Sequence, residues 1–91
     1  MLKIEKKSKP IGDLKEGDKL FINGKEMKID KQFVFIEHGK SNEMIIEFFN
    51  PDNEREYQLR YFDDQIDSSI EIYELMEEFQ YLKREPKSIS W

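Results

Sequence analysis

The chain has 91 residues, no cysteine and a formal net charge of −5 at pH 7. This length predicts one domain over residues 1–91 with a single modest core, and the lack of cysteine excludes disulfides, zinc–thiolate sites and thiol catalysis. The acidic balance disfavours non-specific binding to a phosphate backbone, and no apolar run approaches the ~18 residues of a membrane helix. We therefore expect a cytoplasmic domain that does not enter a membrane.

Residues 1–10 form a polar lead-in that carries four lysines but lacks the apolar centre of a signal peptide. The strongest local signal follows in Leu14–Asp30, where Asn23-Gly24 separates two alternating runs. Asn-Gly between such runs is typical of a β-hairpin with a type I′ turn, because both turn residues tolerate positive φ. The pattern predicts a first strand at Lys19–Ile22 and a second strand that begins directly after the turn.

Three further segments are predicted to be strands. Lys31–His38 continues or restarts the second strand, and the four consecutive apolar residues Phe33–Ile36 predict that this strand is covered on both faces. Glu43–Phe49 and Glu54–Phe62 alternate apolar with polar residues on either side of a proline-containing turn. Short strands joined by tight turns are typical of an antiparallel meander, so we expect residues 11–62 to form a sheet.

Residues 63–91 combine an acidic amphipathic segment with a terminal strand or tail, and the segment fits two structures. The first is a helix, because Ser68–Glu71 has the spacing of a capping box and the apolar residues that follow keep helical periodicity. The alternative is a pair of strands, Ile70–Leu75 and Phe79–Lys83, which would turn Glu77 towards the core. We favour the helix because an unpaired buried carboxylate is costly.

The residues do not form a pattern typical of an enzyme. The serines lie outside the G-x-S-x-G context of a nucleophile, and the glycines fall in turns or at strand ends, away from any phosphate loop. His38 is the only histidine, and Glu43 across the Gly39 turn is its candidate hydrogen-bond partner. We interpret His38 as a surface residue at a hairpin end. We expect no catalysis and no cofactor.

Apolar and aromatic residues occur at both odd and even positions of neighbouring predicted strands, and therefore on both faces of the sheet, which favours a contact surface. Ile45 and Phe49 have the opposite parity from the predicted core of their strand. Tyr57 and Tyr61 crowd the next strand beside Arg60, and their alternative role is to pack inward with the hydroxyls at the rim. A C-terminal tryptophan either docks on the sheet or anchors a partner. The surface expected to bind a protein partner or a second copy comprises Ile45, Phe49, Tyr57, Arg60, Tyr61 and Trp91.

Two further functions are alternatives. Aromatic residues beside arginines on a sheet stack nucleic-acid bases in small barrels, so RNA or a ribosome is the second candidate partner. Its contacts would be Lys3, Lys6, Lys7, Lys9, Arg55 and Arg60. The third candidate is a weak Mg²⁺ or Ca²⁺ site, because Asp63, Asp64 and Asp67 have the spacing of a DDxxD motif. Acidic residues at the N-terminus of a helix also interact favourably with the helix dipole, which explains the same cluster without a metal.

The segment Ile11–Asp30 resembles the opening of SH3-like barrels in translation proteins. In the elongation factor P and initiation factor 5A families, a loop with Leu and Gly-Asp precedes the first strand and a tight turn, as Leu14, Gly17-Asp18 and Asn23-Gly24 do here. The resemblance implies a small barrel but transfers no activity, because the chain has no equivalent of the loop that carries the modified lysine of those families.

The second half, with RYFDDQIDSSIEIYEL and the terminal Trp91, is similar to short archaeal proteins of unknown function, which implies neither activity nor site. Together these features predict a mainly β fold. We expect a small antiparallel meander or SH3-like barrel of about four to six strands, followed by the amphipathic C-terminal segment.

Overall fold

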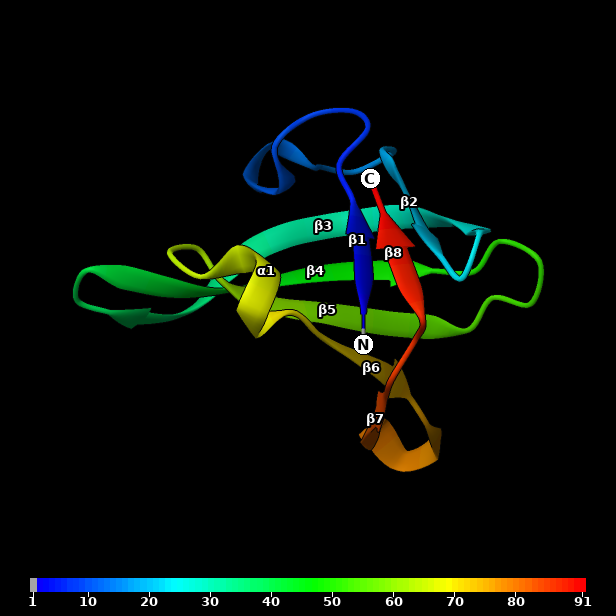
Figure 1. The fold of residues 1–91 in the computed structure, drawn as a ribbon. Helices are drawn as coiled ribbons and strands as arrows, with labels where there is room; N and C mark the ends of the chain where they lie inside the picture. The colour runs from blue at the N-terminus through cyan, green and yellow to red at the C-terminus, as the bar shows by residue number, and fades with distance from the viewer. Residues whose placement is uncertain (1) are drawn as a thin grey trace.

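The computed structural model describes residues 2–91 and consists mainly of one curled sheet (Figure 1). Strands account for 54% of the chain, which confirms the mainly β class. The sheet has eight strands in the order β1-β8-β2-β3-β4-β5-β6-β7, more than the four to six expected, and it curls into a half-barrel whose edges are β1 and β7. None of the helical turns in residues 2–91 has the length and apolar character needed to span a bilayer.

The elements are short except for the long strands β3 and β4. The strands are β1 (Lys3–Glu5), β2 (Lys19–Ile22), β3 (Lys25–His38), β4 (Ser41–Phe49), β5 (Glu56–Phe62), β6 (Glu71–Leu75), β7 (Tyr81–Arg84) and β8 (Ser88–Ser90). The helical turns are η1 (Ile11–Asp13), α1 (Ile66–Ser69) and η2 (Glu77–Phe79). Neighbouring strands pair antiparallel, except that β1 runs parallel to β8.

The β2–β3 hairpin forms as the sequence predicts. Asn23 and Gly24 have φ angles of 52° and 80°, so the turn needs residues that tolerate the left-handed region. The Asn23 side chain has a second role, because its Oδ1 accepts hydrogen bonds from the backbone N–H groups of Lys87 and Ser88 at 2.8 and 3.1 Å. The turn thereby holds the chain that leads into β8, which lies next to β2 in the sheet.

The core lies on the inner face of the curl, where β1 and β8 cross over the strands β3 to β5 (Figure 1). Alternate residues of the central strands point there, and Ile89 and Trp91 close the core from the other side. The fully buried side chains of this core are Leu20, Ile29, Ile46, Phe48, Leu59, Tyr61 and Ile89. The backbone of Trp91 also holds the lead-in, since its carbonyl accepts the N–H groups of Lys7 and Ser8.

A polar clamp fastens the η1 loop to the sheet. The Gln32 side-chain amide donates to the carbonyls of Ile11 and Leu14 at 3.0 and 2.8 Å. Its oxygen accepts the hydroxyl of Tyr61 at 2.5 Å. Because one side chain satisfies two loop carbonyls and a buried hydroxyl, Gln32 connects the loop, β3 and β5.

The favoured C-terminal helix is wrong, and the strand pair forms instead. Residues 71–75 pair with β5, and residues 81–84 pair with residues 72–75. The predicted cap does not form, because the Ser68 hydroxyl donates to the Gln65 carbonyl and α1 ends after one turn. Ser69 has a different role, since its hydroxyl oxygen accepts the Phe62 N–H at 2.8 Å and ties α1 to β5.

A carboxylate does point towards the core of the strand pair, but it belongs to Glu74 and not to the expected Glu77. Glu77 lies in the exposed turn η2, whereas Glu74 points inward and is 6% exposed. Arg55 and Arg84 both pair with Glu74, at 2.5 and 2.9 Å. Paired charges offset the penalty of burying a lone carboxylate, so the inward position of Glu74 is compatible with the strand pair.

The expectation that Phe33–Ile36 is covered on both faces is also wrong. Val34, Phe35 and Ile36 are 45%, 48% and 42% exposed. β2 pairs only with Lys25–Lys28, so Val34–Ile36 have a strand neighbour on the β4 side alone, and beyond them the β3–β4 hairpin extends past the other strands at the left of Figure 1. The register shifts between Val34 and Ile36, which marks a bulge at Phe35.

Candidate functional site

An aromatic surface surrounds Arg60 on the outer face of the sheet. The register places Phe33, Ile45 and Arg60 side by side on three strands, with the parity opposite to the core. Two residues before Arg60 on β5, Gln58 pairs with Tyr73 of β6, and both side chains lie on this same face. The outer aromatic face, as we name it, comprises Phe33, Phe35, Arg60, Tyr73 and Tyr81.

Arg60 is the centre of this face. Its Cζ lies 4.2 Å from the ring centroid of Tyr73 and 5.7 Å from those of Phe35 and Tyr81. Its Nε and Nη2 donate to the Gln58 oxygen at 3.1 and 2.9 Å, and the Gln58 amide donates to Glu47 at 3.0 Å. Within residues 2–91, Arg60 forms no ion pair with a carboxylate. The guanidinium is therefore oriented by an amide and by aromatic rings, and its charge is not neutralised by a contacting acid.

Ile45 lies beneath this cluster instead of at the surface. It is 1% exposed and stands between Phe33 and Arg60 in the register, outside the inner core. The predicted contact surface therefore cannot use Ile45 as a contact in this conformation, because longer neighbours on the same face cover it. Phe49 is half-buried further along the same face.

The other predicted partner residues lie on the inner side. Tyr61 and Trp91 are 2% and 3% exposed, so both are part of the core. Tyr57 is half-buried and stacks on Phe48 with ring centroids 5.3 Å apart. Arg60 is thus the residue of the predicted set that the structure places among accessible aromatic rings.

Sequence reasoning missed Phe35, Tyr73 and Tyr81 as neighbours of Arg60. The strand-pair alternative contained part of the signal, because Tyr73 and Tyr81 lie within its two predicted strands. Phe35 joins the face through a bulge, which no sequence pattern indicates. The large exposed apolar residues of the described chain are Val34, Phe35, Ile36, Met76, Phe79, Tyr81 and Leu82, and of these Phe35 and Tyr81 belong to the outer aromatic face.

The basic residues predicted for RNA do not form one patch. Most pair with nearby carboxylates: Lys3 and Lys7 with Glu5, Lys6 with Asp67, Lys9 with Asp18, and Arg55 with Glu74. The lysines belong to the β1 region on the inner side, whereas Arg60 points from the outer face. A phosphate backbone would have to compete with the four lysine pairs and bridge two faces.

The acidic cluster has structural contacts. Asp63 accepts the backbone and side-chain N–H groups of Asn42 at 2.9 and 3.2 Å, and Asp67 pairs with Lys6 at 2.9 Å. Asp64 is exposed. Across residues 2–91, no three His, Cys, Asp or Glu side chains come together as metal ligands. His38 and Glu43 lie 3.8 Å apart, which is too long for a hydrogen bond.

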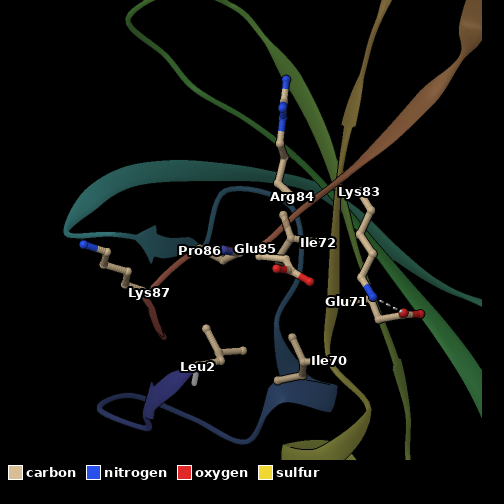
Figure 2. Close-up of a pocket in the computed structure, with 9 residues that line it drawn as sticks. All are labelled: Leu2, Ile70, Glu71, Ile72, Lys83, Arg84, Glu85, Pro86 and Lys87. Carbon is tan, nitrogen blue, oxygen red and sulfur yellow. Dashed lines mark ion pairs between the residues drawn. The ribbon is translucent and has the colours of Figure 1, made fainter.

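A cavity of about 400 Å³ lies near the two open edges of the half-barrel (Figure 2). Leu2, Ile70 and Ile72 supply apolar lining, and Glu71 pairs with Lys83 at 3.0 Å on one side. The Arg84 side chain points away from the cavity in Figure 2. The lining also includes Glu85 and Lys87, which form no ion pair among the described residues.

No protein-family model, curated protein or solved structure matches the chain, so only its residues and their geometry bear on function.

Proposed function

We propose that the protein is a non-enzymatic binding module whose outer aromatic face contacts a protein partner or a second copy. The observation that carries the proposal is Arg60, held by Gln58 against the ring of Tyr73 and free of a carboxylate. Interfaces are enriched in tyrosine, phenylalanine and arginine, and arginine and tyrosine are frequent hot-spot residues. Pre-oriented rings and guanidinium lose little conformational entropy on binding.

A protein suits this face better than RNA. Five of the six cations assigned to RNA binding are already paired with carboxylates. The net charge of the chain is −5, which opposes the long-range attraction that dominates nucleic-acid binding. The uncommitted charge of Arg60 instead suits one carboxylate or carbonyl of a partner, surrounded by apolar contacts.

Two double variants test the proposal, because β3 and β7 each offer adjacent residues of similar exposure on opposite faces. Phe35→Ser with Tyr81→Ser removes two rings of the outer aromatic face, and Val34→Ser with Leu82→Ser is the matched control on the other face. We expect sedimentation or affinity capture to show an assembly that the first variant loses and the control retains. A strict monomer that captures no protein, or equal loss in both variants, would contradict the proposal.

A further inference from the structure

A second, separate feature is a basic hollow on the inner side of the sheet. It lies between the β2–β3 turn, the β4–β5 turn and the strands β6 and β7, with a volume of about 610 Å³. Its chemistry-bearing lining residues are Lys25, Asn53, Arg55, Tyr57, Glu74 and Arg84. The proposed binding function does not use this hollow.

A buried carboxylate orients two arginines of the hollow. The Glu74 side chain is 8% exposed and accepts Nη1 of Arg55 and Nε of Arg84, at 2.5 and 2.9 Å. A guanidinium has five N–H donors, so each arginine keeps donors for a ligand. Two oriented guanidinium groups at one cavity match the geometry that oxyanions require.

The hollow also carries excess positive charge. Lys25 is exposed, makes no ion pair within residues 2–91, and has the parity of the buried Met27. The lining contains one carboxylate, that of Glu74, and three cationic side chains, those of Lys25, Arg55 and Arg84. Two positive charges are therefore not balanced within the lining. This local surplus stands out in a chain whose net charge is −5.

We infer that this hollow binds a phosphate-type oxyanion, either free phosphate or the phosphoryl group of a small ligand. The two surplus positive charges match a dianion, and Asn53 and Tyr57 add polar groups at the rim. Because the hollow is broad and open to solvent, its charge contacts are screened and binding falls in the millimolar range.

Titration with inorganic phosphate, followed by the NMR signals of the protein, tests the inference. We expect saturable shifts at Lys25, Arg55 and Arg84, and a stronger response to glycerol phosphate if a phosphorylated small molecule is the ligand. Lys25→Gln should weaken binding about two- to fivefold, the effect of one exposed charge contact. Lys28→Gln is the matched control, since Lys28 lies on the same strand with the opposite parity and should leave binding unchanged.

Glu74→Gln provides an independent readout in the opposite direction. The single oxygen of the Gln amide can accept a hydrogen bond from one arginine, whereas its NH2 group cannot accept from the other, which releases that guanidinium. Because the only negative charge of the lining is also lost, phosphate should bind more tightly. The inference is overturned if no saturable shift occurs, if the shifts map elsewhere, or if the Lys25 and Lys28 variants lose affinity equally. Equal loss would indicate only a general ionic atmosphere.

Discussion

Replacing Tyr61 with phenylalanine removes one hydroxyl from the clamp that fastens the η1 loop. The ring keeps its place in the core, so the substitution opens no cavity of note. What changes is the Gln32 oxygen, which loses the donor that lies 2.5 Å away. The Gln32 amide group still has to remain oriented towards the carbonyls of Ile11 and Leu14.

The expected cost follows from one lost hydrogen bond and one underused acceptor. A net hydrogen bond contributes about 1 kcal/mol, and an unsatisfied buried acceptor adds a penalty that water reduces here because Gln32 is only half-buried. We expect the free energy of unfolding to fall by about 1–2 kcal/mol, or Tm by about 4–16 °C for a domain of this size.

Thermal and urea unfolding, followed by circular dichroism, measure this cost. Tyr73→Phe is the control, because its hydroxyl bonds at 3.3 Å to the partly exposed Glu71 and should change stability by less than about 0.5 kcal/mol. In a Gln32→Leu background, Tyr61→Phe should be neutral or stabilising, since the hydroxyl then has no partner. An equal cost of Tyr61→Phe in both backgrounds would refute the clamp.

Three further outcomes are expected. Burial opposes ionisation of Glu74, but hydrogen bonds from Arg84 and Arg55 outweigh it and hold its pKa below the ordinary 4.5. Its contribution to stability is therefore present above pH 4.5 and is lost as the pH falls through the lowered pKa, so Glu74→Gln should flatten this acid limb of the unfolding curve. Glu78 and Phe79 have φ angles of 62° and 59°, so placing Asn-Gly there should raise stability by about 1–2 kcal/mol in thermal unfolding; no gain would mean that the turn is unstrained. Burial, with Asp63 nearby, raises the pKa of Tyr61 to about 12, so ultraviolet titration should show a late tyrosine that Tyr61→Phe removes; an early, unchanged titration would contradict this burial.

The strands β2 to β5 were predictable because their signals are local. Asn23-Gly24 determines the first turn, and alternation assigns the faces of the strands that follow. The tail was not predictable in this way, since its apolar residues fit a helix and a strand pair equally well. What decides between them is pairing with β5 and the neutralisation of Glu74 by Arg55 and Arg84, which lie 19 and 10 residues away in sequence.

The candidate site was predictable only through Arg60. Parity alone indicated that Ile45 faces outward, but the side chains of its cross-strand neighbours bury it. Phe35 reaches the outer aromatic face through a bulge, and Tyr81 reaches it through the tail pairing. Each of these effects depends on residues distant in sequence, so no local pattern could reveal the surface.

Footprinting of the assembled state tests the outer aromatic face most directly. Hydroxyl-radical oxidation of the captured complex, or of the self-associated protein, should be compared with that of the free monomer. We predict that Phe35, Tyr73 and Tyr81 become protected while Val34 and Leu82 stay reactive. Protection of Val34 and Leu82 with unchanged reactivity at the three aromatic residues would contradict the account.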